Sequence, residues 1–327
     1  AGGCAVPGVM ATRTLKSPRE RLATLLTVPF MNCGAKLPVF ALLIATFFAK
    51  YEAAIMFLIT LGAWAGALLV AKLLRVTVIK GAATPFVMEL PPYRMPTFKG
   101  LAIHTWERTW QYIKKAGTVI LGLSIVLWAM MTFPGLPDNR IQEFETLRRS
   151  EISRVPAAIA DELKAAREGA ELSRPARNLK KSLQHIDADE AEAGLRYSIA
   201  GRIGGALEGV SRWAGFDWRT NIALVGGFAA KEVVVSTLGT AYSLGEVDPE
   251  ETGSLSETLA KDPGWSPLLA VGLIVFTMFY SPFFVSVICI SRESGSWKWG
   301  AFAMAFNTVL AFLLAVLIFQ VGTAFGL

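Results

Sequence analysis

Two cysteines lie in apolar segments that helix-breaking residues interrupt. Cys4 follows Gly2-Gly3, and Cys33 lies between Pro29 and Pro38. Thiolates favour soft transition metals over Mg²⁺ and Ca²⁺, and a broken backbone leaves carbonyl oxygens free to act as further ligands. The two thiols are therefore candidate ligands of a transient transition-metal site. The alternative is that both are packing residues, since a cysteine in an apolar segment also behaves as a small hydrophobe.

Charged residues inside apolar sequence form a second set of candidates. Glu232 lies in the middle of an apolar segment, where a charge costs roughly 2.5–3.5 kcal/mol on insertion scales. It could ligate a cation, or it could form a buried ion pair with Lys36. Lys36 and Lys231 would repel a cation, so we expect packing or gating roles for them. The weaker ligand candidates are the two residues that precede Cys33, Met31 and Asn32.

The elements that must position these residues are predicted to be transmembrane helices. The 327 residues are 53% hydrophobic and 18% charged, whereas soluble domains carry about 25% charge. Four uncharged runs of about 18 residues or more match the ~30 Å hydrocarbon core of a bilayer; they are 53–71, 116–133, 264–291 and 299–327. We therefore predict an all-α fold, a polytopic transmembrane helical bundle.

The candidate residues lie mainly in two apolar segments that are interrupted, 22–48 and 219–244. Each segment places small residues and then a lysine, Lys36 or Lys231, within an otherwise apolar helix. Broken helices at membrane depth are tolerated where they face protein or line a cavity, and they form the substrate sites of transporters. We expect the two segments to be paired repeats that run in opposite directions, as inverted repeats do.

Three regions follow from this pattern. Residues 1–133 hold the first broken segment, the following spanning helices and an interfacial amphipathic helix at 98–115. Residues 134–200 form a polar insert in which acidic and basic residues nearly balance. Residues 201–327 hold the second broken segment and two C-terminal spanning helices.

Charge and composition exclude several classes of protein. The net charge of +6 comes from Lys and Arg that lie mostly between apolar runs, as membrane orientation signals do, rather than on a nucleic-acid-binding stripe. The basic segments 13–21 and 72–99 are therefore predicted to be cytoplasmic, which places the polar insert outside. An enzyme is not expected, because the chain has two histidines and no arrangement of a nucleophile with a base.

Five stretches along the chain read GCAVPGVMATRT at 3–14, PFMNCGAKLPV at 29–39, ATPFVMELP at 83–91, AKEVVV at 230–235 and SRES at 291–294. In this order they resemble the membrane domain of the bacterial ferrous iron transport protein B (FeoB) family. The two lysine-bearing segments resemble the paired Gate repeats of that family. One departure is that the family commonly carries Pro-Cys in the penultimate span, where this chain has Pro282-Phe283, with Cys289 about two helical turns further on.

The resemblance implies uptake of Fe²⁺ across the bacterial inner membrane, with the pathway at the two broken Gate helices. Fe²⁺ would be the transported substrate, and Lys36 and Lys231 would act in gating or ion pairing. The alternative is a Gate-type carrier of nucleosides or other small solutes, although the placement of the cysteines favours a metal. The pathway residues that the resemblance favours are the candidates named above, Cys4, Cys33, Glu232, Met31 and Asn32.

The resemblance also implies partners. The family carries an N-terminal GTP-binding domain, whereas the phosphate-binding motif G-x-x-x-x-G-K-[ST] does not occur in this sequence. We therefore expect the chain to be the C-terminal part alone, to bind no guanine nucleotide, and to depend on GTP and Mg²⁺ only through that domain. Further expected partners are membrane lipid, small cytoplasmic Feo proteins and a second copy of the chain, but no nucleic acid.

Overall fold

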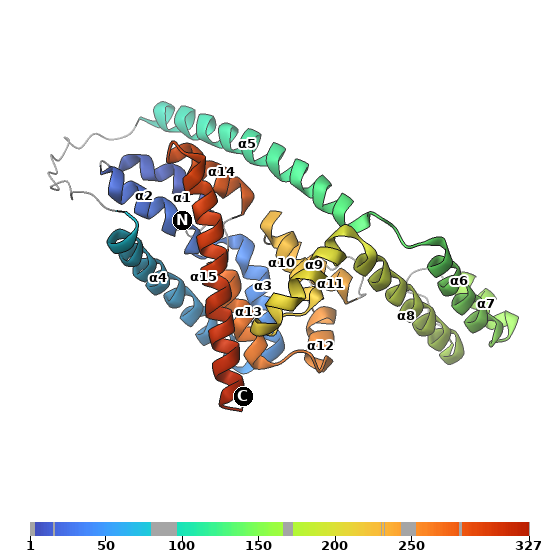
Figure 1. The fold of residues 1–327 in the computed structure, drawn as a ribbon. Helices are drawn as coiled ribbons and strands as arrows, with labels where there is room; N and C mark the ends of the chain where they lie inside the picture. The colour runs from blue at the N-terminus through green and yellow to red at the C-terminus, as the bar shows by residue number, and fades with distance from the viewer. Residues whose placement is uncertain are drawn as a thin grey trace.

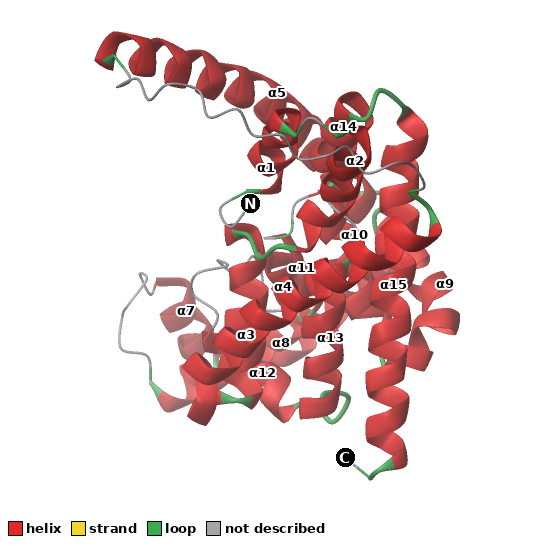
Figure 2. Ribbon diagram, turned by 90° about the vertical axis from the view of Figure 1, so that its left-hand side faces the viewer, coloured by secondary structure: helices red, strands yellow, loops and turns green. Residues whose placement is uncertain are grey.

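The computed structural model describes residues 4–15, 17–79, 97–165, 173–229, 231, 233–242, 253–280 and 283–326. In these residues the regular structure is entirely helical, without a strand (Figure 1 and Figure 2). The prediction of an all-α membrane bundle is confirmed. The candidate ligand Glu232, the stretch 83–91 and Pro282 lie outside the described residues.

The described α-helices are, in chain order, α1 (Ala5–Ala11), α2 (Pro18–Thr27), α3 (Leu37–Phe47), α4 (Glu52–Thr77), α5 (Phe98–Thr132), α6 (Asp138–Ser153), α7 (Ala157–Ala165), α8 (Arg174–Tyr197), α9 (Ile199–Ser211), α10 (Trp218–Ala229), α11 (Val233–Ala241), α12 (Gly253–Lys261), α13 (Pro267–Phe279), α14 (Phe284–Glu293) and α15 (Trp297–Ala324). Short 3₁₀ turns accompany them at η1 (Thr12–Thr14), η2 (Val28–Phe30), η3 (Gly34–Lys36), η4 (Ala49–Tyr51) and η5 (Arg212–Ala214). Ser-Pro sequences begin two of the bundle helices: Ser17 caps α2 and Ser266 caps α13, each through its side chain, with proline in the first turn.

Four stretches of the described residues are long and apolar enough to cross a membrane. They are Pro18–Phe47, Ala49–Thr77, Pro267–Glu293 and Trp297–Ala324. Three of them overlap the predicted uncharged runs 53–71, 264–291 and 299–327, and the first covers the predicted broken segment 22–48 except for its last residue. The remaining predicted run, 116–133, belongs to α5. This helix is continuous over 35 residues, so the expected interfacial helix at 98–115 and the span after it are one element.

The first broken segment passes through the bundle with an interruption in its middle. The chain leaves helical geometry at Met31, is extended at Cys33 (φ −129°, ψ 162°), and resumes a helix after η3. Pro29 lacks the N–H that would continue the α2 ladder, and Pro38 occupies the first turn of α3, where a missing N–H costs nothing. The two prolines therefore determine where the helix stops and where it restarts.

The second broken segment folds back on itself, because α10 and α11 pack against each other. Helices α10 and α11 pack antiparallel, as two close approaches show. A Cβ at Gly226 would lie 3.1 Å from Thr237 Oγ1, and one at Gly227 would lie 2.4 Å from Val234 Cγ2. With 12 and 9 residues, the helices span about 18 and 14 Å, too short for a ~30 Å core. The segment is a helical hairpin, so its path differs from that of the first broken segment.

The remaining elements form a third interruption and a peripheral region. Helix α13 ends at Phe279 and α14 begins at Phe284, so the penultimate span is also broken. Residues of the predicted polar insert form α6, α7 and α8, which extend away from the bundle (Figure 1). Arg148 on α6 pairs with Asp187 and Glu190 on α8, so partly exposed ion pairs join these two helices.

Candidate functional site

Lys36 joins the break of the first segment to the end of α13. It is only 1% exposed, and its Nζ donates to the carbonyl oxygens of Pro29 (3.2 Å), Phe30 (3.4 Å) and Met31 (3.3 Å). It also donates to the Met278 carbonyl at 2.9 Å, across 242 residues of sequence. Interrupted helices leave carbonyl groups without N–H partners, and an ammonium group satisfies several of them at once.

Lys231 reaches the same end of α13 from the tip of the α10–α11 hairpin. It is 5% exposed, and its Nζ lies 3.5 Å from the carbonyl oxygens of both Thr277 and Tyr280. The ammonium also lies 5.5 Å from the centroid of the Tyr280 ring, within cation–π range. The Tyr280 hydroxyl donates to the Leu224 carbonyl at 3.1 Å, which ties α10 to the end of α13.

The three interruptions therefore meet at one place, which we call the break cluster: residues 29–36, Lys231 and residues 277–280. Carbonyl oxygens at the C-terminus of a helix carry partial negative charge, so two ammonium groups there are electrostatically favourable. The expected pairing of Lys36 with Glu232 remains a prediction, since Glu232 lies outside the described residues. The partners of Lys36 in the described residues are carbonyl oxygens.

The other candidates of the first segment belong to the break cluster. Cys33 is half-buried and lies within electrostatic range of both ammonium groups. Met31 contributes its carbonyl oxygen to Lys36. The Asn32 amide donates weakly to Thr60 Oγ1 at 3.4 Å, while its buried Oδ1 has no hydrogen-bond partner. Thiol, carbonyl and amide donors thus line this break.

Cys4 lies at the N-terminal end of α1. It is half-buried at the start of this helix, which packs against both α14 and η2. Because the chain after α1 reaches Glu293 at the far end of α14, the start of α1 is directed toward the break. Among the described residues, no group of three or more His, Cys, Asp or Glu side chains could hold a metal ion. The two thiols are thus not part of a preformed acid- or histidine-rich centre there.

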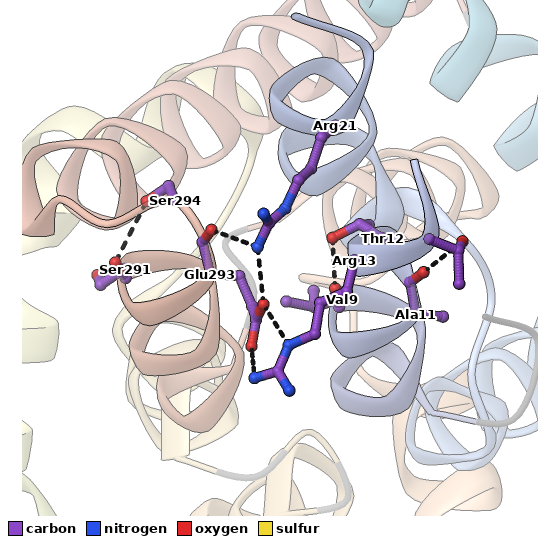
Figure 3. Close-up of polar contacts among 9 residues, drawn as sticks. Val9, Ala11, Thr12, Arg13, Arg21, Ser291, Glu293 and Ser294 are labelled. Atoms are coloured by element: carbon purple, nitrogen blue, oxygen red, sulfur yellow. Dashed lines mark hydrogen bonds and ion pairs between the residues drawn. The ribbon is translucent and has the colours of Figure 1, made fainter. Parts of the chain in front are cut away.

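A partly buried ion-pair cluster lies at the other end of α14, and its residues were not among the candidates predicted from the sequence. Glu293 is held by two arginines of the N-terminal segment (Figure 3). Arg13 contacts both carboxylate oxygens, with Nε to Oε2 at 2.7 Å, and these contacts raise the pKa of the Arg13 guanidinium. Arg21 Nη2 donates to Oε2 at 3.0 Å and to the Glu293 carbonyl at 2.8 Å. In the sequence, two features could have indicated this contact: one acid after a long apolar run, and an excess of arginine at 13–21.

This pair is expected to stabilise the bundle measurably. The Glu293 side chain is 6% exposed and that of Arg21 is 33% exposed, so their coupling should lie between surface and buried values, at about 1–2 kcal/mol. A double-mutant cycle with Arg21→Met and Glu293→Gln, measured by unfolding in mixed micelles, gives this energy. Arg292→Met, which changes the exposed neighbour on α14, should leave stability unchanged. Additive effects of the two substitutions would contradict the prediction.

Two family models match this chain. Residues 56–108 match the family model described as ferrous iron transport protein B C terminus, and residues 113–297 match the Gate model, described as nucleoside recognition. No solved structure matches the chain. The fold, the converging breaks and the Gate match together define a helical membrane protein of the Gate class.

Curated relatives specify the family further. The chain is 38% identical over 331 residues to the Fe(2+) transport protein A/Fe(2+) transporter FeoB fusion protein of Porphyromonas gingivalis, covering 99% of this chain and 37% of that protein. It is 36% identical to the Fe(2+) transporter FeoB of Helicobacter pylori and 30% identical to that of Staphylococcus aureus, covering 46% and 40% of their lengths. The chain belongs to the ferrous iron transport protein B family, and it corresponds to the C-terminal membrane part. It spans less than half the length of these relatives.

Proposed function

We propose that the chain forms the membrane pathway by which Fe²⁺ enters the bacterial cell across the inner membrane. The observation that carries the proposal is the meeting of three helix breaks around carbonyl oxygens, with Cys33 beside them. A hydrated Fe²⁺ can cross hydrocarbon only if protein ligands replace its water, and carbonyl oxygens together with a thiol offer such ligands. The names of the relatives as Fe(2+) transporters support this substrate.

Lys36 and Lys231 act as the gate in this proposal. Their ammonium groups contact the carbonyl oxygens that an entering cation would need, which supports the interpretation of this arrangement as a closed pathway. Opening then requires the lysines to leave these oxygens. A divalent ion that moves down 100 mV gains roughly 4.6 kcal/mol, so the membrane potential can drive Fe²⁺ inward while a partner domain controls the gate.

The partners proposed for this control lie outside the chain. They are the family's GTP-binding domain with GTP and Mg²⁺, and small Feo proteins. The Porphyromonas gingivalis relative is named as a fusion of Fe(2+) transport protein A with the transporter, which supports a small Feo protein as a partner. No catalytic role is proposed for the chain itself, and Fe²⁺ is its substrate rather than a resident cofactor.

The proposed orientation has residues 13–21 and 72–99 in the cytoplasm and residues 134–200 outside. In its support, Arg19 Nη2 donates to the Arg75 carbonyl at 2.8 Å, so both basic segments lie at one end of the bundle. A cysteine introduced at Ser150 should react with an impermeant reagent in intact cells, whereas one at the exposed Thr14 should be protected. Protection at position 150 would overturn the orientation.

Uptake into proteoliposomes tests the function itself. The native protein should accumulate Fe²⁺ in response to an inside-negative potential and should not accumulate a nucleoside. The nucleoside is the informative competitor because Gate is described as nucleoside recognition. Uptake of the nucleoside without Fe²⁺ would favour the small-solute alternative and refute the proposal.

A further inference from the structure

Asn307 is a polar residue in an otherwise apolar contact of the last helix. It lies in the middle of α15 and is 0% exposed. Neither Oδ1 nor Nδ2 of its carboxamide has a hydrogen-bond partner. The other buried residues of this helix are small and have no polar side-chain atoms: Gly300, Ala303, Ala311, Ala315 and Gly322. An unpaired carboxamide at such a position opposes folding and calls for a functional explanation.

The helix contacts of α15 locate Asn307 opposite the third break. A Cβ at Gly300 would lie 3.0 Å from the Val287 carbonyl on α14, and one at Gly272 on α13 would lie 3.9 Å from the Ala315 carbonyl. Both α13 and α14 run antiparallel to α15. Because all three helices rise by the same distance per residue, each step forward along α15 corresponds to one step backward along α13 or α14. Both extensions place Asn307 level with Tyr280, directly after the end of α13 at the third break.

Other buried polar atoms near this break also lack partners. They include the hydroxyl of Thr277, whose carbonyl faces Lys231, and the hydroxyl of Ser286 in the first turn of α14. Both residues are at most 2% exposed. The third break thus has two buried hydroxyl oxygens without a hydrogen-bond partner, one on α13 and one on α14.

We propose that the carboxamide oxygen of Asn307 is a ligand of the divalent cation as it passes the third break, an assignment that rests on the proposed function. A carboxamide can replace one water of an Fe²⁺ hydration shell. It carries no charge, so it binds the ion without holding it as a carboxylate would, which suits a site that must release its ion. Asn307 supplies this ligand from α15, while Lys36 and Lys231 occupy the carbonyl oxygens of α13 in the closed arrangement.

Anaerobic calorimetry of Fe²⁺ binding to the native protein in nanodiscs tests this assignment. Asn307→Leu keeps the size and removes both polar atoms, so it should weaken Fe²⁺ binding by about tenfold, the lower end of losses at metal-site residues. It should not lower the melting temperature of the metal-free protein, because no hydrogen bond is lost. Asn307→Asp should tighten Fe²⁺ binding, because it supplies a charged carboxylate in place of the carboxamide. If the leucine variant does not fold, Asn307→Ala is measured in its place. Thr308→Val on the same helix, whose hydroxyl bonds the Met304 carbonyl, is the matched control and should bind as wild type does.

The outcomes separate this inference from the proposed function. Wild-type Fe²⁺ affinity in the Asn307→Leu and Asn307→Ala variants, together with weakened binding in Cys33→Ser, would overturn the role of Asn307 and leave the proposed function standing. A large fall in the metal-free melting temperature of both Asn307 variants would assign the residue to packing and overturn the ligand role. Absence of Fe²⁺ binding in the wild type would overturn the proposed function and the inference with it.

Discussion

Lys36→Met is expected to destabilise the bundle by about 3 kcal/mol, because buried carbonyl groups that lose their donor cost about 1–3 kcal/mol each. Methionine keeps most of the side-chain volume but cannot donate to the Pro29, Phe30, Met31 and Met278 carbonyls. Relief of the desolvation cost of the ammonium offsets part of this loss. The loss should dominate, since several buried carbonyl oxygens lose a shared donor of three N–H groups when one charge is removed. Unfolding in mixed micelles measures the difference.

Lys50→Met is the matched control for this substitution. Lys50 is exposed in η4 and contacts only the ring of Tyr51 among its described partners, at 5.6 Å. Its removal should change stability by less than about 0.5 kcal/mol. Equal stability of Lys36→Met and wild type would mean that the carbonyl groups find water or other donors. The convergence of the breaks would then not depend on the lysine.

The interrupted first segment could be predicted from local sequence. Pro29 and Pro38 act on the backbone within one or two residues, and their effect on a helix needs no knowledge of the rest of the fold. The apolar runs could be predicted for the same reason, because the length of a span is set by the bilayer. The continuity of α5 was missed because the change from amphipathic to apolar sequence at residue 115 resembles a boundary.

The contacts between distant segments could not be predicted from the sequence. Lys36 meets Met278 only because α3 packs against α13, and Glu293 meets Arg13 only because α1 packs against α14. The α10–α11 hairpin was not predicted from the sequence. Two short apolar helices that are separated by only a few residues have the same hydrophobic pattern as one longer span. Gly226 and Gly227 precede that turn, and their lack of side chains allows the close approach of α11.

The break cluster shows which groups the Lys36 ammonium contacts among the described residues. A lysine within an apolar segment suggested repulsion of a cation or a pair with an acid. In the structure, the ammonium of Lys36 lies among carbonyl oxygens much as a bound cation would, at 2.9–3.4 Å. In the proposed pathway, the oxygens that would bind the transported ion are therefore satisfied by lysine while the pathway is empty. This arrangement avoids unpaired buried carbonyl groups in the closed state.

Cys33→Ser is expected to reduce Fe²⁺ uptake by about tenfold while the melting temperature changes little, since losses of this size follow removal of a group that orients or binds a metal. Serine keeps the size of cysteine but replaces a soft sulfur, which can ionise, with a hard hydroxyl oxygen. Cys4→Ser should act in the same direction, because α1 directs Cys4 toward the same break. Initial rates of Fe²⁺ uptake into proteoliposomes, measured at several Fe²⁺ concentrations, provide the comparison.

Cys289→Ser separates a ligand effect from a general sensitivity to thiol loss. Cys289 is also half-buried, but it lies on α14 one turn from Glu293 and away from the carbonyl groups that face the lysines. Its replacement should leave uptake within about twofold of wild type, as expected for a residue outside the site. If the Cys4→Ser/Cys33→Ser double variant transports Fe²⁺ as fast as wild type, the thiols are packing residues. The carbonyl and amide oxygens of the break cluster would then have to bind the ion without sulfur, and selectivity against Mg²⁺ and Ca²⁺ should be correspondingly poor.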